Sequence, residues 1–281
     1  MDRRRAPYLT KIVASAMVAA RGWAALEGTD PAPQVVRLAG THPGLAVGAQ
    51  DFRGNPATAA MAPATFESGA GITRPLGLDG LQEQAGWASW VAAVGGNSSG
   101  AARLGWRGFS ADDLYRDDAM FGTLAWRWRN VGVGITGEAL RCDYGENVVG
   151  SAFGASMGAA LRWKDFVLGA STGDISIFHA EPTWMNEPTE TAIGLGFAPH
   201  SEAWRTALTT SFREGQGWDW RMAQEVTLPA GLDAGVGIGV EPFRMAGGIG
   251  WSLGWSRLDA AVEGDPVLGW QSHVSLGLAI R

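Results

Sequence analysis

The chain has 281 residues, with 41 glycines, 14 tryptophans and a net charge of −6. This length suits one large domain, and so many glycines argue against long soluble helices. The acidic balance excludes nucleic acid as a partner, and the single cysteine, Cys142, excludes an intramolecular disulfide and a cysteine metal site.

The first 24 residues have the features of a secretory leader. Four basic residues lie among the first eleven, and residues 12–20 form a short apolar run. Gly22 and Ala24 are small residues at the −3 and −1 positions of a possible cleavage site. We therefore predict a signal peptide over residues 1–24. A short amphipathic helix is the alternative, because Arg21 interrupts the apolar run.

The next segment, residues 25–63, has a different composition from the rest of the chain. Five prolines break any regular element within it. Asn55 is a good N-cap residue and Pro56 fits the first turn of a helix, so a short helix is predicted to begin at Asn55.

From residue 65 onward, apolar residues alternate with small or polar ones. In the last segment Val274, Leu276 and Leu278 share one parity, whereas Ser275 and Gly277 lie on the other. A period of two places each set on its own face of a β-strand. Glycine, serine and arginine cannot form a dense apolar core, so one face is apolar and the other is wet. A transmembrane β-barrel has this arrangement, with lipid outside and a polar lumen inside.

Turn-like residues such as 129–130, 214–217 and 229–231 divide this region into fourteen segments. The predicted strands are 65–73, 81–94, 100–110, 119–129, 131–142, 149–163, 165–173, 190–198, 203–214, 218–228, 231–241, 243–255, 256–263 and 269–281. Residues 174–190, with two prolines, are expected to form a long loop. The predicted fold class is all-β: a closed antiparallel transmembrane β-barrel of about 14 strands over residues 64–281, with a short N-terminal plug segment.

Charged residues on the predicted inward face are the candidate site. They are Arg127, Arg129, Arg162, Arg205, Arg221, Arg244, Glu138, Glu225, Asp233 and Glu241. An arginine on the lipid side at mid-bilayer would cost roughly 2–4 kcal/mol, which favours the inward assignment. Inside a lumen these groups would pair with one another and hold plug and wall together, or they would bind an anionic ligand.

Aromatic and histidine residues give two further alternatives. Most tryptophans lie near predicted strand ends, as in the girdles at membrane interfaces, although they could also form stacking platforms for sugars or lipids. Barrel-embedded lipid deacylases carry a His-x-Ser pair, and His273 and Ser275 have this spacing. The pair lies on the inward parity, opposite Val274. We therefore predict no enzymatic activity, no cofactor and no metal site.

Three sequence features carry a resemblance to a known family. Residues 37–48 are similar to the glycine- and alanine-rich opening of its mature proteins, and residues 52–57 look like its Phe-x-Asn-Pro-Ala segment. Short glycine-rich strands follow to the C-terminus, with Tyr115 to Ala119 preceding one of them. In these respects the chain resembles the outer-membrane proteins that include the fatty-acid transporter FadL and the PorV/PorQ proteins.

The resemblance implies a fourteen-stranded barrel in the outer membrane of a Gram-negative-type bacterium. Residues 25–63 would form a hatch in the lumen, where Asn55, Pro56 and Ala57 would lie against the wall. Asn55 would either cap the helix or contact a ligand. The implied function is transport of hydrophobic compounds, or a surface shuttle or scaffold role for secreted proteins. The expected partners are membrane lipid and a hydrophobic small molecule or a secreted protein.

Two other functions remain open from the sequence. A soluble or surface-attached β-rich protein could bind carbohydrate through its tryptophans, but its apolar parity would then be packed between facing sheets. A barrel could also organise the outer membrane without transporting anything.

Overall fold

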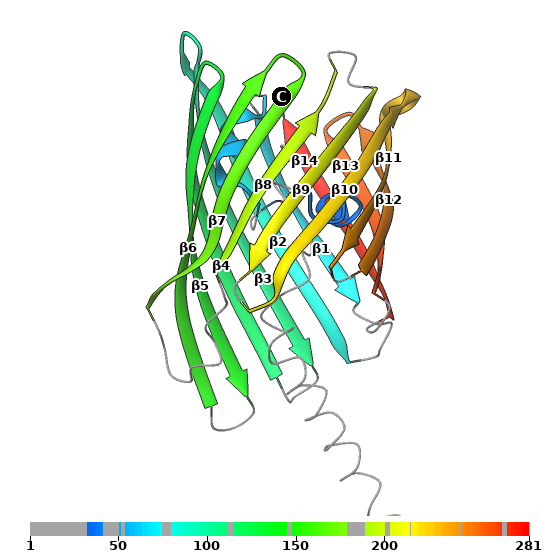
Figure 1. The fold of residues 1–281 in the computed structure, drawn as a ribbon. Coiled ribbons are helices and arrows are strands. Elements are labelled where there is room, and N and C mark those ends of the chain that lie inside the picture. The colour runs from blue at the N-terminus through cyan, green and yellow to red at the C-terminus, as the bar shows by residue number, and fades with distance from the viewer. Residues whose placement is uncertain are drawn as a thin grey trace, which may run out of the picture.

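In a computed structural model of the chain, the described residues form a closed antiparallel barrel of fourteen strands (Figure 1). The structure describes residues 33–41, 51, 54–63, 65–74, 80–111, 115–144, 148–178, 189–199, 203–213, 215–241, 243–265 and 269–280. The predicted signal peptide lies outside these residues. No helix among them is long and apolar enough to cross a membrane.

The strand bounds agree closely with the predicted segments. The strands are β1 (Thr65–Arg74), β2 (Leu81–Gly95), β3 (Ser98–Ala111), β4 (Tyr115–Trp128), β5 (Val131–Tyr144), β6 (Val148–Trp163), β7 (Phe166–Phe178), β8 (Glu190–Phe197), β9 (Trp204–Arg213), β10 (Gly217–Leu228), β11 (Leu232–Val240), β12 (Phe243–Leu253), β13 (Ser256–Asp265) and β14 (Gly269–Ile280). Short helices are α2 (Pro33–Val36), η2 (Pro56–Met61) and η5 (Pro229–Gly231).

Each strand pairs with its neighbours in sequence, and β1 pairs with β14 to close the ring. The closing register sets Ile72 opposite Val274. Tight turns such as Arg129–Asn130 and Lys164–Asp165 join the strands at one end of the barrel, here named the turn end. The opposite end is named the loop end. The predicted fold class is confirmed, because the fourteen strands pair antiparallel into one closed barrel.

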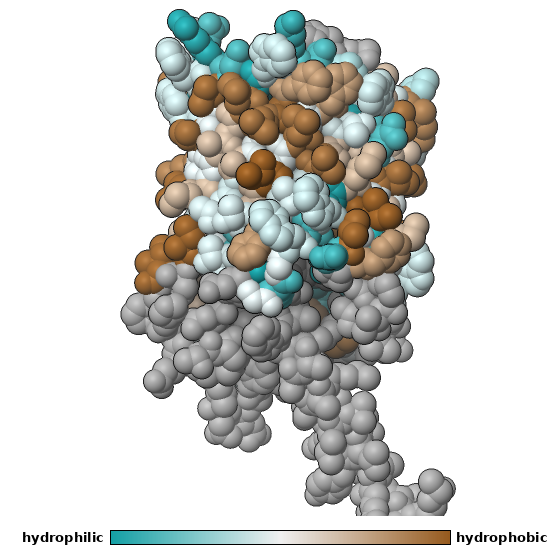
Figure 2. Space-filling model, in the orientation of Figure 1, coloured by the Kyte–Doolittle hydropathy of each residue, from teal (hydrophilic) through white to brown (hydrophobic). Residues whose placement is uncertain are grey.

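The apolar parity faces outward. The side chains of Val274, Leu276 and Leu278 are 45%, 59% and 40% exposed. Large apolar side chains are exposed on the other wall strands as well, and hydrophobic residues spread over the wall below a hydrophilic upper rim in Figure 2. A soluble sandwich would bury this parity between its sheets. The barrel instead has the inside-out polarity that lipid requires.

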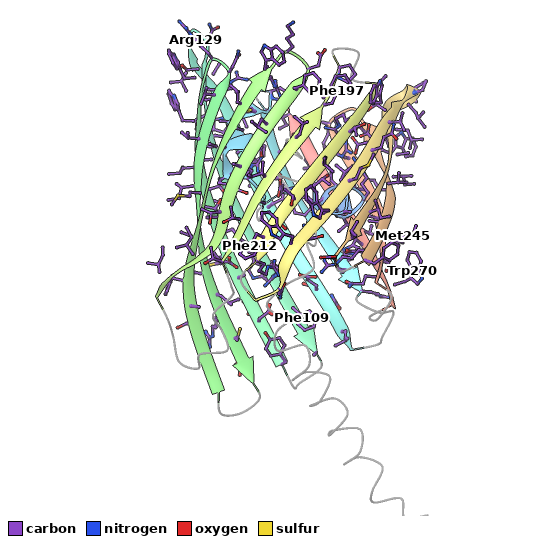
Figure 3. The ribbon with its side chains drawn as sticks, viewed as in Figure 1. Phe109, Arg129, Phe197, Phe212, Met245 and Trp270 are labelled. Carbon is purple, nitrogen blue, oxygen red and sulfur yellow. The ribbon has the colours of Figure 1, made fainter. Side chains whose placement is uncertain are left out.

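Aromatic residues follow the turn end of the wall. Trp163, Phe166, Phe197 and Trp204 form a line across β6 to β9, with successive ring centroids 6.3, 4.9 and 5.1 Å apart. Figure 3 shows Phe197 near this end, whereas Phe212, Met245 and Trp270 lie nearer the loop end. A continuous line of this kind favours the girdle interpretation over isolated sugar platforms.

Two strands, β4 and β7, extend well beyond their predicted bounds. β4 begins at Tyr115, although residues 115–119 were expected to precede the strand. β7 continues to Phe178, although the loop was expected from Asp174. The polar inward residues explain the first error, because Asp117 is fully buried and accepts a hydrogen bond from the Tyr115 hydroxyl at 3.0 Å. The polar residues at the loop end of β4 therefore still belong to the strand.

Candidate functional site

The described part of the N-terminal segment lies inside the barrel (Figure 1). It comprises residues 33–41, 51 and 54–63, here named the plug. The helices of the plug contact the wall in two places, η2 against β3 to β6, and α2 with its following turn against β9 to β14. These two contacts make up the candidate site.

The predicted helix at Asn55 is present as η2. The Asn55 side chain accepts a hydrogen bond from the backbone N–H of Ala57 at 3.0 Å, which is the capping contact that the sequence predicts. Its Nδ2 also donates to the backbone oxygen of Ala159 on β6, at 2.9 Å. Asn55 thus serves two purposes, because it starts the helix and fastens it to the wall.

Glycines on the inner face of β5 and β6 allow η2 to approach so closely. A Cβ atom at Gly134 would lie 2.6 Å from the backbone carbon of Pro56, and one at Gly132 would lie 3.0 Å from the Ala57 oxygen. A Cβ at Gly158 would collide with the Asn55 side chain. The inner glycines therefore receive the plug backbone, and no larger residue would leave room for it.

The second contact is an ionic one. Arg37 follows α2 and is fully buried. Its Nε donates to Glu225 on β10 at 2.7 Å, and its Nη1 donates to Asp259 on β13 at 2.6 Å. One side chain of the plug thereby joins wall strands on either side of it.

Two wall arginines complete this cluster. Arg205 on β9 pairs with Glu225. Arg257 on β13 donates to Asp233 at 2.8 Å and to Asp259 at 2.9 Å. Three guanidinium groups therefore face three carboxylates, so the buried charges balance. This set, Arg37, Arg205, Glu225, Asp233, Arg257 and Asp259, is here named the ionic latch.

Glycines also line the wall beside the ionic latch. A Cβ at Gly237 would lie 2.7 Å from the Cβ of Ala39, and one at Gly235 would lie 3.2 Å from the Arg37 side chain. The glycine-rich inner face was expected to be wet. At both contacts it is instead the surface on which the plug packs.

The sequence-predicted candidates do not all meet. Glu225, Asp233 and Arg205 join the ionic latch. Arg221 donates to Asp219 at 2.5 Å and to the Gly40 oxygen of the plug at 3.4 Å. In these contacts charged residues of the wall pair with one another and with the plug. This is the internal pairing that the sequence analysis gave as one alternative to ligand binding.

The other candidates do not join the ionic latch. Arg127 and Glu138 are half-buried on the wall, and Arg244 lies 3.9 Å from Glu263. Arg162 is exposed at the turn end of β6.

Two candidates were misplaced by the sequence analysis. Arg129 and Glu241 are in turns beyond their strands, so neither side chain belongs to the lumen wall. Arg129 instead stacks over the Trp128 ring, 4.8 Å from its centroid. The error arises because parity alone assigns a face as far as the last predicted residue, whereas the strands end one residue earlier.

Sequence reasoning missed half of the ionic latch. Arg257 and Asp259 lie opposite the exposed Leu258, so the alternation that located the other inward charges also indicates these two. Arg37 carries no such signal, because it lies in a segment without strand periodicity.

The His-x-Ser pair faces inward as expected. His273 and Ser275 are buried, and the His273 Nδ1 lies 2.9 Å from the Thr73 hydroxyl. The described residues contain no group of three or more His, Cys, Asp or Glu side chains that could hold a metal ion.

Comparison with known proteins identifies the fold. No model of a protein family matches the chain, and no curated protein matches it. The toluene transporter TodX of Pseudomonas putida superposes with a TM-score of 0.61, covering 90% of this chain and 97% of TodX at 12% identity. The chain has the fold of TodX.

A TodX mutant, the deltaS2S3 form of a monoaromatic hydrocarbon channel, gives a similar result. Its TM-score is 0.59, with 11% identity over 85% of this chain and 95% of the mutant. At this identity the likeness concerns the fold and does not extend to individual residues.

Proposed function

We propose that the chain is a FadL-type outer-membrane barrel through which small hydrophobic molecules pass. The observation that carries the proposal is a closed barrel with an apolar exterior and a plug fastened inside, in the fold of a toluene transporter. TodX is a transporter of the FadL family, which supports the FadL part of the resemblance.

The outer membrane is the compartment that fits this exterior. Outer-membrane barrels have an even number of antiparallel strands, short periplasmic turns and an outward apolar band between aromatic girdles. The turn end then faces the periplasm and the loop end faces the cell exterior. A leader over residues 1–24 would provide export to that membrane.

The lining of the lumen favours an apolar cargo. Towards the loop end, Trp87, Phe121 and Leu140 point inward and pack into one buried cluster with Tyr115 and Cys142. Charged groups of the same strands are buried beside this cluster, where Arg107 lies 3.8 Å from both Glu83 and Asp117. The aromatic and aliphatic side chains of the cluster would provide dispersion contacts to a hydrophobic ligand.

The plug is the proposed gate. While the ionic latch and the Asn55 contact hold, α2 and η2 obstruct the turn-end half of the lumen. A ligand that enters from the loop end would need the plug to shift, or would leave through the wall.

Uptake by intact cells tests this function. The protein would be expressed in a Gram-negative host lacking its own hydrophobic channels, and uptake of radiolabelled toluene and of glucose would be measured. Faster toluene uptake than in the empty-vector strain, with glucose uptake unchanged, is the expected result. Equal toluene uptake in the two strains would refute the transport role.

Fractionation of the same cells distinguishes the competing functions. Extraction only with detergent and a heat-modifiable gel band are expected for the barrel. Release into the soluble fraction would favour the carbohydrate-binding alternative. Co-purification of one secreted protein, without toluene uptake, would favour the shuttle or scaffold role.

A further inference from the structure

The outer face of β3 carries a hollow that the transport proposal does not use. Three consecutive outward positions, Ser98, Gly100 and Ala102, bear small side chains. The register places Gly100 between Ala92 and Trp126, and Ala102 between Trp90 and Leu124. Larger side chains thus border a floor of small ones.

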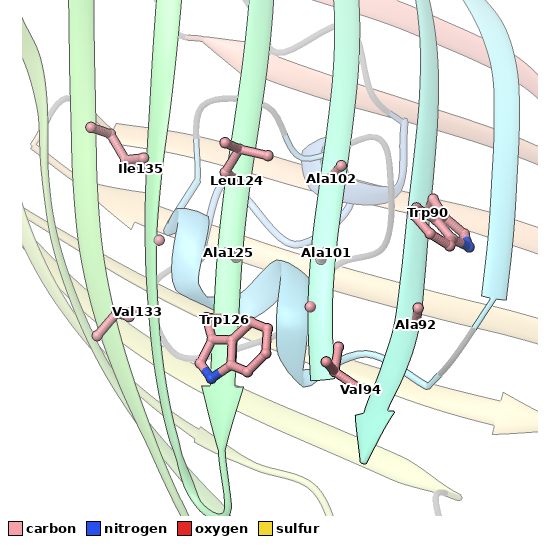
Figure 4. A pocket seen from close by; sticks show the side chains of 12 residues that line it. Trp90, Ala92, Val94, Ala101, Ala102, Leu124, Ala125, Trp126, Val133 and Ile135 are labelled. Atoms are coloured by element: carbon pink, nitrogen blue, oxygen red, sulfur yellow. The ribbon is translucent and has the colours of Figure 1, made fainter. Parts of the chain in front are cut away.

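This hollow has a volume of about 640 Å³ and an almost wholly apolar lining. Figure 4 shows Trp90 and Val94 on β2 at one side of the β3 floor, and Leu124 and Trp126 on β4 at the other. It is here named the outer trough. Its floor on β3 extends from Gly100 to Ala102, and Val133 and Ile135 on β5 line it beyond β4.

The floor of the outer trough is supported from within. Ala101 and Ala125, on the inner face of the same strands, pack against Ala59 and Ala60 of the plug helix η2. The wall therefore cannot readily collapse to fill the hollow. In a bilayer an unfilled hollow loses its dispersion contacts, so a hydrocarbon chain is the natural occupant.

A cation lies at the mouth of the outer trough. The backbone N–H of Arg129 donates to the Asn97 oxygen at 2.8 Å, which joins the β4–β5 turn to the turn that precedes Ser98. The guanidinium is held over the Trp128 ring, at the rim of the barrel. An exposed arginine at this depth is suited to the phosphate of a lipid headgroup.

We propose that the outer trough binds one acyl chain of an anionic phospholipid from the periplasmic leaflet, with the lipid phosphate at Arg129. The lipid would serve as a bound component of the wall rather than as transported cargo. The inference rests on the membrane placement in the proposed function but not on transport. A loss of lipid retention therefore leaves the transport proposal intact, and a lack of toluene uptake leaves the lipid site intact.

Filling the trough tests the acyl-chain site. In Gly100→Leu the atoms nearest to the new Cβ would be side-chain carbons of Trp126 and Val94, at 3.6 Å, so the strand is expected to accept it. The matched control is Gly137→Leu on β5, which also lies on the outer face and has nothing within 4 Å of its Cβ. Ala102→Leu, on the same floor, provides a second filling variant.

Native mass spectrometry during stepwise delipidation with phosphatidylglycerol gives the readout. Wild type and Gly137→Leu are expected to retain one lipid after the bulk lipid has gone. Gly100→Leu and Ala102→Leu are expected to lose it, with retention about tenfold lower. The proposal is overturned if wild type retains no lipid, or if the filling variants retain as much as the control. A heat-modifiable gel band verifies that each variant is folded.

The headgroup contact has its own matched pair. Arg129→Gln is expected to abolish the preference for phosphatidylglycerol over phosphatidylcholine. Lys164→Gln removes another rim cation, one stacked 5.3 Å from the Trp163 ring but not at the trough, and should leave the preference intact. Raising the salt concentration should weaken the preference for phosphatidylglycerol in wild type. Equal effects of the two variants would refute the assignment of the phosphate to Arg129.

Another occupant would be visible in the same spectra. A second copy of the chain seated on the trough would appear as a dimer that Gly100→Leu dissociates. That outcome would overturn the lipid site and assign this face to self-association. A monomer whose single lipid depends on Gly100 supports the proposal.

Discussion

At Arg37 a fully buried guanidinium lies between the carboxylates of Glu225 and Asp259. Removing one partner of a buried ion pair leaves an uncompensated charge, and the usual cost is about 3–5 kcal/mol. We therefore expect Arg37→Met to weaken the attachment of the plug by an amount of this order. Protease cleavage of the plug in the folded barrel, followed over time, would report the change.

A surface ion pair provides the control for Arg37. Arg116 donates to Asp118 at 2.8 Å, but its side chain is 67% exposed. Solvent already screens such a pair, so Arg116→Met should leave the cleavage rate unchanged. If Arg37→Met also left it unchanged, the ionic latch would not be what holds the plug.

A charged residue could be assigned to the inner or outer face of the barrel wherever it lies within a strand. Glu225 and Asp233 were placed inward because their neighbours along the strand are apolar and must face out. Arg129 and Glu241 were misplaced because they lie just past a strand end, where the alternation no longer determines orientation. Arg37 could not be found in this way, since its partners are about 190 or more residues away in sequence, and only the tertiary fold brings them together.

At the scale of elements, the contact between η2 and β6 depends on a missing side chain. Any Cβ at Gly158 would overlap the side chain of Asn55. Gly158→Leu should therefore displace η2 from the wall and open the turn-end half of the lumen. Ion conductance across a planar bilayer should rise above that of wild type.

Gly137→Leu is the matched substitution for this measurement. It introduces the same side chain on β5, where nothing lies within 4 Å of the new Cβ. Conductance should stay at the wild-type level. A similar rise in both variants would indicate general loosening of the barrel rather than loss of the plug.

The strands were predictable because each carries its own signal, whereas the role of their glycines was not. Alternation and turn residues located the strand ends to within a few residues. The inner glycines looked like the lining of a wet lumen, because a sequence does not show what approaches them. Only the close contacts of Gly134 and Gly237 with the plug backbone show why side chains are absent there.

For the whole molecule, closure of the sheet follows from physical necessity once the polarity is known. A sheet with an apolar outer face cannot leave unpaired strand edges in lipid, so β1 must pair with β14. Fourteen strand segments in the sequence were enough to anticipate the barrel. The cargo could not be predicted in the same way. It depends on the shape and lining of the lumen, which residues from distant strands form together.

The outward polarity of the barrel predicts how stability depends on depth in the membrane. Val236, 63% exposed, lies in the middle of β11, whereas Leu253, 52% exposed, is next to the turn that follows β12. An arginine costs about 2–4 kcal/mol at the midplane of a bilayer and about 0–1 kcal/mol near its surface. Val236→Arg should therefore lower the urea midpoint of the reconstituted barrel well below that of Leu253→Arg. In a water-soluble protein both positions would face solvent and tolerate arginine equally. Equal midpoints would thus contradict a lipid-facing wall, and with it the proposed place of this protein in the outer membrane.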